Sequence, residues 1–259
     1  MYTIGKDAGI FRMPSKASLA VTAADVGACL QIRSRHDRTM IVVKEAIARY
    51  LATQARTRRR LMEVGGAEGW QTVYFQHQLA EPQRAAIVDW RDSRLDAVKP
   101  LTDFFQVDIE TDPIPVADGS YDVIVCNQVL EHLKNIDFPI TEIHRVLRPG
   151  GVLIVSVPNL GALHNVLLLA LGRQPSTLAL QGSHVRGFTM EAMTRYLTFN
   201  EHFRLRHLWG FGLHPFTSSA IPPPLRRYCH TPLWILEKNI SDRPTWVDYR
   251  AGVATTTKF

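Results

Sequence analysis

A glycine-rich turn follows a short apolar run in this chain, and the pair limits the folds that the chain can adopt. The run at residues 61–64 ends in the turn at residues 65–69, and a helix-compatible segment at residues 70–80 comes next. Glycine tolerates positive φ and a close backbone approach, so such a turn leaves room for a ligand. In open α/β sheets, ligands bind outside the carboxyl ends of the strands. The turn therefore predicts a ligand site at that edge of a sheet.

Apolar runs and helical patterns alternate along most of the 259 residues. This alternation predicts a doubly wound α/β domain with a mostly parallel sheet, because near-continuous apolar strands are typical of sheets covered on both faces. We expect an N-terminal extension and helix at 1–55, the main domain at 56–240 and a poorly ordered tail at 241–259. The expected helices are 37–55, 70–80 and 138–147, and the expected strands are 61–65, 85–89, 104–108, 121–127, 152–157, 203–210 and 232–238.

Composition and charge exclude several classes of protein. Hydrophobic and charged contents of 46% and 21% are ordinary for a soluble domain. The net charge of +6 is scattered apart from residues 56–60, which we expect to be a solvated helix end, so no nucleic acid partner is expected. The unbroken apolar stretch at 166–171 is too short to cross a bilayer. Three distant cysteines without metal-ligand spacing predict a reducing cytoplasm and no metal, and the oligomeric state stays open.

Three acidic residues each end a predicted strand. These are Glu63, Asp89 and Asp108, and Asp89 lies 24 residues after the first glycine of the turn. A carboxylate at that spacing suits the vicinal hydroxyls of a ribose. We expect Asp108 to accept from an exocyclic amine such as that of adenine. Trp90 and Ile109, just beyond these acids, are expected to contact the faces of the base.

The turn itself argues against a dinucleotide. The three glycine positions of a dinucleotide-binding turn are occupied here by Gly65, Ala67 and Trp70. A tryptophan at the third position would push the helix away, and Glu68 places a negative charge where a phosphate would bind. A nicotinamide-dependent reductase is therefore disfavoured, and the site fits a nucleoside without phosphates. Glu63 could then hold a cationic or amine-bearing tail.

With these residues in place, the chain resembles a class I S-adenosylmethionine-dependent methyltransferase. It is most similar to the broad group that includes the ubiquinone and menaquinone biosynthesis methyltransferases. The resemblance is carried by four segments, at 63–69, 114–124, 127–133 and 147–153, and covers residues 59–160 well and residues up to 238 more faintly. It implies a Rossmann-like methyltransferase fold with a seven-stranded sheet and S-adenosyl-L-methionine as the cofactor.

The same resemblance implies which residues bind that cofactor. Ala67 departs from the family's pattern, because it replaces the middle glycine of the turn. This departure leaves open a methyltransferase-like binding or scaffold protein without turnover. The implied cofactor-binding residues are Glu63, Gly65, Ala67, Gly69, Asp89, Trp90, Asp108, Ile109 and Asn127.

The acceptor is less constrained by the sequence. We expect methyl transfer to oxygen, nitrogen or carbon of a small-molecule, saccharide or lipid-linked acceptor. A hydroxyl acceptor needs a base, and His132 is the candidate, although it could instead support the sheet edge. Glu131 is read as a first-turn acid of a helix. The segment after the fifth strand, where this family builds acceptor-binding elements, contributes His164, His184, Arg186 and an apolar stretch at 167–171, which forms a lid or packs on the core.

Overall fold

The computed structural model describes residues 35–54, 58–79 and 83–239. Residues 1–34 of the predicted N-terminal extension and the predicted tail at 241–259 lie outside these ranges. The proposed division of the chain into an extension, a domain and a tail therefore stays a prediction.

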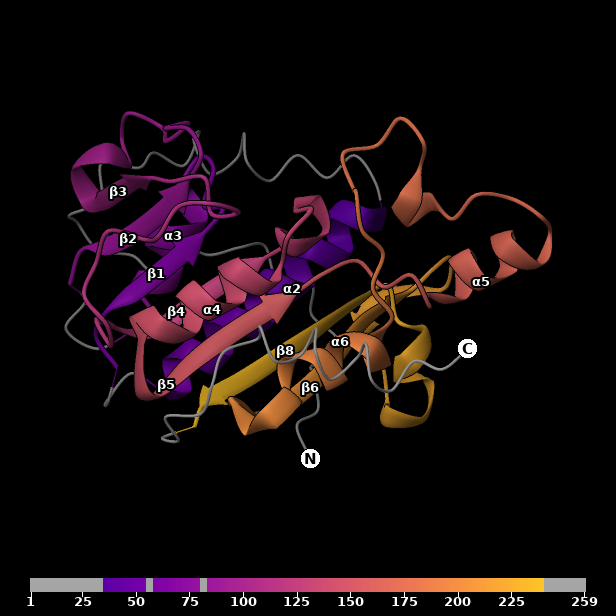
Figure 1. Cartoon of the computed structure of the whole chain (residues 1–259). Helices are drawn as coiled ribbons and strands as arrows, with labels where there is room; N and C mark the ends of the chain where they lie inside the picture. The colour runs from indigo at the N-terminus through magenta and orange to yellow at the C-terminus, as the bar shows by residue number, and fades with distance from the viewer. Residues whose placement is uncertain (1–34, 55–57, 80–82, 240–259) are drawn as a thin grey trace.

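The described chain contains one mixed sheet of eight strands (Figure 1). The strands are β1 (Leu61–Val64), β2 (Ala85–Asp89), β3 (Thr102–Gln106), β4 (Tyr121–Asn127), β5 (Leu147–Ser156), β6 (Phe203–Leu213), β7 (Thr217–Ala220) and β8 (Thr231–Lys238).

The strand order across the sheet is β3-β2-β1-β4-β5-β8-β6-β7. The neighbouring strands β3, β2, β1, β4 and β5 are parallel to one another. Strand β8 runs antiparallel to both of its neighbours, β5 and β6. The chain builds outward from β1 to β3 and then returns to place β4 on the other side of β1. Open α/β sheets bind ligands where the strand order reverses in this way. The crevice at the carboxyl ends of β1 and β4 is therefore the expected site.

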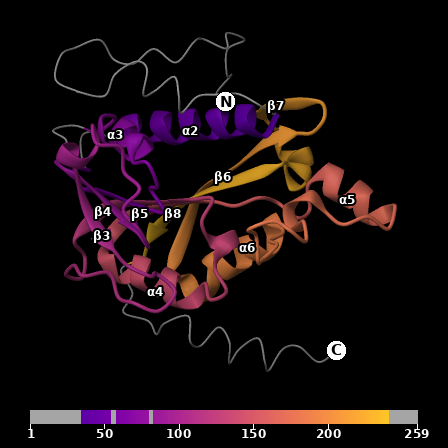
Figure 2. The same ribbon diagram turned by 90° about the horizontal axis from the view of Figure 1, so that it is seen from above.

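Helices cover both faces of the sheet. Figure 2 shows α2 and α3 on one face and α4 and α6 on the other, while α5 extends away from the sheet. None of the described helices combines the length and the apolarity that crossing a membrane requires. The helices are α2 (Arg35–Thr53), α3 (Trp70–Gln76), α4 (Asp137–Val146), α5 (Leu163–Ala170) and α6 (Met190–Leu197), with short 3-10 turns at η1 (Lys99–Leu101), η2 (Leu130–His132), η3 (Ser176–Leu178), η4 (Phe199–Glu201) and η5 (Pro223–Tyr228).

The core consists of two main apolar layers, one on each face of the sheet. Val43, Ile47 and Leu51 recur on one side of α2 and are fully buried against the sheet. Ile140 and Ile143 of α4 do the same on the opposite face. The apolar faces of the helices thus cover both faces of the sheet, and the central strands can be apolar along nearly their whole length because both of their faces are buried.

Several strand limits differ from those expected. Strand β3 begins and ends two residues early, because it pairs with β2 from Thr102 onward, and Asp108 therefore lies beyond the strand. Strand β5 begins at Leu147, and the expected turn at 148–151 forms an irregularity inside the sheet, where Gly150 adopts a φ of +71°. Strand β7 was not expected, because its sequence TSSA lacks an apolar pattern. It forms a strand through its antiparallel pairing with β6.

The basic run before β1 was expected to be solvated, and this expectation was wrong for Arg58. Its side chain is buried and donates to the carbonyl oxygens of Asp122 and Gly150 at 3.2 and 3.0 Å. The carboxylate of Asp122 accepts from the backbone N–H groups of Arg59 and Arg60 at 2.8 Å. These contacts link the start of β1 to β4 and β5, so Arg58 supports the sheet.

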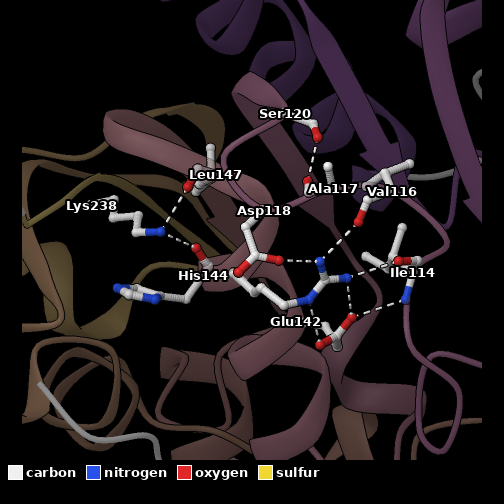
Figure 3. Close-up of polar contacts among 10 residues, drawn as sticks. Ile114, Val116, Ala117, Asp118, Ser120, Glu142, His144, Leu147 and Lys238 are labelled. Carbon is white, nitrogen blue, oxygen red and sulfur yellow. Dashed lines mark hydrogen bonds and ion pairs between the residues drawn. The ribbon is translucent and has the colours of Figure 1, made fainter. Parts of the chain in front are cut away.

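A second polar network holds the amino-terminal edge of the sheet (Figure 3). Arg145 of α4 donates to Asp118 and Glu142, each at 2.7 Å, and to the carbonyl oxygens of Ile114 and Val116, each at 2.8 Å. Glu142 is buried and also accepts from the backbone N–H of Ile114 at 2.9 Å. This edge is thereby committed to structural contacts, in contrast to the opposite edge.

Candidate functional site

The turn after β1 uses left-handed backbone at three positions. The φ angles of Gly65, Ala67 and Gly69 are +71°, +44° and +79°. A Cβ atom at Gly65 would lie 2.5 Å from Cγ2 of Val129, and one at Gly69 would lie 2.7 Å from Cγ1 of Val98. Two of the glycines are therefore required both by backbone conformation and by close neighbours. The turn lies directly against the segment that leaves β4.

Ala67 adopts the conformation that suits a glycine, at a cost of roughly 1–2 kcal/mol for an L residue. Its backbone N–H donates to Oδ2 of Asp89 at 3.1 Å. This hydrogen bond ties the middle of the turn to the end of β2. The turn therefore forms with an alanine at this position. The same hydrogen bond holds the carboxylate of Asp89 at the carboxyl edge of the sheet, called the rim below.

The ends of β2 and β3 place two predicted acids at one edge. Asp89 pairs with Gln106, and the backbone N–H of Val107 donates to the carbonyl oxygen of Asp89 at 3.0 Å. Asp108 is the next residue and is exposed. Its Oδ1 accepts from the backbone N–H of Glu110 at 3.1 Å, which fixes the following turn. Asp89 and Asp108 are thus brought together, as the sequence predicted.

The two residues predicted to contact the base differ in exposure. Trp90 is 65% exposed, and the guanidinium of Arg91 lies 4.8 Å from its ring centroid. Ile109 is buried in the apolar layer that includes α4. An exposed indole beside a carboxylate offers a flat apolar surface to a ligand. Base stacking on Trp90 stays a prediction.

Glu63 lies deeper than the two aspartates. It is buried, and its two carboxylate oxygens accept from Gln71 and Thr72 of α3. Burial raises the pKa of Glu63 to about 7, and the hydrogen bonds from Thr72 and Gln71 lower it in part. Glu63 therefore fastens α3 to β1 below the turn. Its contact with a charged tail of a ligand stays a prediction.

The end of β4 is tied to the end of β5. Oδ1 of Asn127 accepts from the hydroxyl of Ser156, and the backbone N–H of Gln128 donates to the carbonyl oxygen of Ser156 at 3.0 Å. Gln128 has a φ of +58°, which turns the chain sharply out of the sheet. Asn127 consequently lies at the same edge as the glycine turn, beside the exit that leads to Val129.

A buried carboxylate and two imidazoles meet just beyond β4. Glu131 is 1% exposed, and neither of its carboxylate oxygens has a hydrogen-bond partner among the described residues. Burial raises the pKa of this carboxyl to about 8. The backbone N–H groups of Val185 and Arg186 donate to the carbonyl oxygen of Glu131, so His184 lies close by. The ring centroids of His132 and His184 are 4.9 Å apart.

Arg186 has a structural role that differs from the acceptor-binding role expected for it. Its guanidinium donates to the carbonyl oxygens of Leu133 and Lys134, at 3.1 Å from Nε in both cases. The segment at 183–186 is thereby fastened over the exit from β4. The acceptor-binding role of this region stays a prediction, and the backbone carbonyl partners of Arg186 have no sequence signal.

Four further histidines gather at the carboxyl end of β5. The ring centroid of His230 lies 4.4 Å from that of His214, 5.2 Å from that of His36 and 5.6 Å from that of His164. Burial, with smaller contributions from the neighbouring histidines, lowers the pKa of His230 to about 3. Burial also lowers the pKa of His36, and the charge of His184 makes a smaller contribution in the same direction.

Three members of this histidine cluster, His36, His214 and His230, were not predicted. They come from the start of α2, the β6–β7 connection and the residue before β8, and they meet through the strand order together with the packing of α2 on the sheet. His164, which was predicted, lies on α5. Leu167, on the same helix, is 54% exposed, which excludes tight packing of this stretch on the core.

Comparison with known proteins identifies the family. The model of the methyltransferase domain family matches residues 35–209, which is more than half of the chain. The chain belongs to this family. Membership, together with relatives named as S-adenosylmethionine-dependent methyltransferases, indicates an enzyme that uses S-adenosyl-L-methionine as its cofactor.

Two curated relatives and one solved structure illustrate the similarity. A probable S-adenosylmethionine-dependent methyltransferase of Mycolicibacterium smegmatis is 36% identical over 105 residues, which are 39% of this chain and 38% of the relative. A malonyl-[acyl-carrier protein] O-methyltransferase of Coxiella burnetii is 35% identical over 88 residues, which are 34% of this chain and 31% of the relative. The chain therefore spans about a third of the length of these curated relatives.

The solved structure supports the fold. A putative S-adenosylmethionine-dependent methyltransferase from Listeria monocytogenes shares 15% identity and a TM-score of 0.52, over 75% of this chain and 99% of the other. The expected Rossmann-like methyltransferase fold is confirmed, with eight strands in the described sheet where seven were expected. The ubiquinone and menaquinone subgroup is not established by these matches.

Within this methyltransferase-family chain, the residues predicted to bind the cofactor gather at the carboxyl edge of the sheet. The glycine turn, the ends of β2 and β4 and the segment after β3 supply them. Glu63 is the one predicted residue that lies buried beneath the edge with both oxygens engaged. The arrangement leaves a rim of two carboxylates beside an open turn.

Proposed function

We propose that this chain transfers the methyl group of S-adenosylmethionine to an amphipathic, lipid-linked small molecule. One observation carries the cofactor half of the proposal. Asp89 is held at the rim by the N–H of Ala67 through Oδ2, while its Oδ1 accepts no hydrogen bond from the described residues. A carboxylate presented in this way suits the two hydroxyls of a ribose, with each charge-assisted bond contributing roughly 1.5–3 kcal/mol.

The chemistry asks mainly for positioning. The sulfonium of the cofactor carries the activated methyl group, so the chain must align the acceptor atom with the methyl carbon and the sulfur and exclude water. Such alignment contributes up to roughly 7–11 kcal/mol. A hydroxyl acceptor also gives up a proton, and the exposed His132 beside the exit from β4 is the residue proposed to receive it.

The surroundings of His164 support an amphipathic acceptor. His164 and His230 each use one ring nitrogen in a hydrogen bond within the chain, and the second nitrogen of each ring makes no hydrogen bond among the described residues. Leu167 and Leu169 of α5 are each 54% exposed, and Leu171, just after the helix, is 74% exposed. We propose that the polar end of the acceptor meets the histidines and that its apolar chain lies along α5. The Coxiella burnetii relative is named a malonyl-[acyl-carrier protein] O-methyltransferase, and a carrier-linked acyl group is consistent with such an acceptor.

Calorimetric titration with S-adenosylmethionine and with its demethylated product tests the cofactor half. We expect the native chain to bind both compounds. Asp89→Asn should lose roughly tenfold or more in affinity, because the hydrogen bonds from the two ribose hydroxyls would no longer be accepted by a charged carboxylate. Asp112→Asn is the matched control, because Asp112 is an exposed acid just beyond the proposed site. Absence of binding in the native chain, or equal binding in Asp89→Asn, would reject the assignment.

A second candidate is a methyltransferase-like binding protein without turnover. The strained φ of +44° at Ala67 favours it, because a backbone that is costly to hold could misplace the cofactor. Incubation with labelled cofactor and a lipid extract, followed by mass spectrometry for methylated products, separates the two. Transfer to any acceptor supports the enzyme, whereas tight cofactor binding without transfer in lipid and polar extracts supports the binding protein.

A further inference from the structure

Glu131 presents an unusual combination of burial and missing partners. Its carboxylate is enclosed, and both oxygens lack hydrogen bonds within the described part of the chain. An unpartnered carboxylate in such surroundings is costly, so buried charged groups are normally paired or bound to a metal. One ligand atom from each of Glu131, His132 and His184 lies within 4.8 Å of the other two. An ion bound between these three ligand atoms would therefore supply the partner that the Glu131 carboxylate lacks.

Hydrogen bonds to backbone carbonyl oxygens fix the tautomers of the two imidazoles. Nδ1 of His132 lies 3.1 Å from the carbonyl oxygen of Ser183, and Nδ1 of His184 lies 2.9 Å from that of Thr177. Because a carbonyl oxygen only accepts, Nδ1 carries the proton in each ring and Nε2 keeps the lone pair. A metal-binding histidine usually donates its other N–H to a backbone carbonyl or a carboxylate, which fixes the ring. Both histidines have this support.

We propose that Glu131, His132 and His184 bind a zinc ion. Two imidazole nitrogens and one carboxylate oxygen suit zinc, whereas magnesium and calcium prefer oxygen ligands alone. Zinc–ligand bonds of about 2.0–2.2 Å separate tetrahedral ligand atoms by roughly 3.3 Å, so the three side chains need to move by little more than about 1 Å. Three protein ligands leave a fourth position open.

The location gives that open position a use. Val129, two residues before Glu131, lies against the glycine turn at Gly65. His132 is exposed, so the ion would be reachable from solvent. An acceptor oxygen in the fourth position would bind as a ligand and lose its proton to solvent more readily, because a bound cation stabilises the anion. With zinc bound, this route would replace proton transfer to His132, whose Nε2 is then a ligand. This last role rests on the proposed function, whereas the binding of zinc does not.

Zinc binding to the full chain, purified without a histidine tag and stripped of metal, tests the proposal. We expect one equivalent of zinc in competition with a chromophoric chelator, and one equivalent of cobalt with the visible absorption of a four-coordinate site. Glu131→Gln, His132→Ala and His184→Ala should each weaken binding by at least the roughly 10- to 100-fold that loss of a supporting contact costs. His77→Ala is the control, since His77 is an exposed imidazole at the end of α3.

Circular dichroism of each variant shows whether it is folded, and Glu131→Gln keeps the shape of the side chain if the alanine variants fail. The proposal is overturned if the native chain binds neither ion, or if all three variants bind as the native chain does. These measurements contain no S-adenosylmethionine. Failure of zinc binding therefore leaves the methyl-transfer proposal intact, and failure of cofactor binding leaves the zinc site intact.

Discussion

The backbone N–H of Ala67 donates to the carboxylate of Asp89 across 3.1 Å. A residue of the glycine turn and the last residue of β2 thereby form one rim, although they lie 22 positions apart in the chain. The contact fixes Oδ2 of Asp89 and leaves Oδ1 available to a ligand. The conformation of Ala67 and the role of Asp89 are consequently linked.

Replacing Ala67 by glycine should relieve backbone strain. The left-handed conformation costs an L residue roughly 1–2 kcal/mol, and glycine loses roughly 0.5–1 kcal/mol through a more flexible unfolded chain. We expect Ala67→Gly to raise the free energy of unfolding by up to about 1 kcal/mol and to bind S-adenosylmethionine at least as tightly. Urea unfolding and calorimetry measure both quantities. A clear loss of either would show that the methyl group of Ala67 makes a contact of its own.

Replacing Gly65 by alanine should have the opposite effect. A Cβ atom there would lie 2.5 Å from the side chain of Val129, and φ is +71°. We expect a loss of about 2–4 kcal/mol of stability from overpacking and backbone strain together. Gly150→Ala is the control, because its φ is also +71° but a Cβ atom there meets nothing within 4 Å. Equal losses in the two variants would contradict the steric argument.

Removing the guanidinium of Arg145 should destabilise the amino-terminal edge. Glu142 is buried, and Arg145→Met leaves its carboxylate without its cationic partner. We expect a loss of up to about 3–5 kcal/mol, the range for a buried ion pair, because the Glu142 carboxylate is buried although the Arg145 side chain is 26% exposed. Arg195→Met breaks the exposed pair with Glu191 and should cost less than about 1 kcal/mol. Similar losses in thermal unfolding would show that the Arg145 network contributes little.

Glu63 should make the stability of the fold depend on pH. Its pKa is raised from 4.5 to about 7 in the folded chain, so the folded chain binds this proton more tightly than the unfolded chain does. The resulting stabilisation is complete below pH 4.5 and is lost as the pH rises through about 7. The difference amounts to roughly 3 kcal/mol at about 1.4 kcal/mol per pKa unit.

The glutamine variant isolates this contribution. Between about pH 5 and pH 8, the native chain should lose roughly 2–3 kcal/mol more stability than Glu63→Gln, which cannot ionise. Chemical unfolding at the two pH values measures the difference. Parallel pH profiles for the two proteins would mean that Glu63 titrates normally in the fold.

Local patterns in the sequence determined the sheet, most of its strands and the edge where the glycine turn, Asp89 and Asp108 meet. They succeed there because burial on both faces forces apolar runs and because parallel strands end on one side. They could not show that Glu63 is engaged by Gln71 and Thr72, since strand position does not give the partners of a side chain.

Only the tertiary structure decided which distant residues meet. His184 comes 52 residues after His132, and His36 and His230 lie near opposite ends of the described chain. His36 and His230 meet because the strand order places β8 beside β5 and because α2 covers the adjoining face. His184 reaches His132 because the backbone N–H groups of Val185 and Arg186 donate to the carbonyl oxygen of Glu131. The physical reason is that periodicity reports whether a residue faces the core, whereas contacts between elements depend on how the whole sheet is assembled.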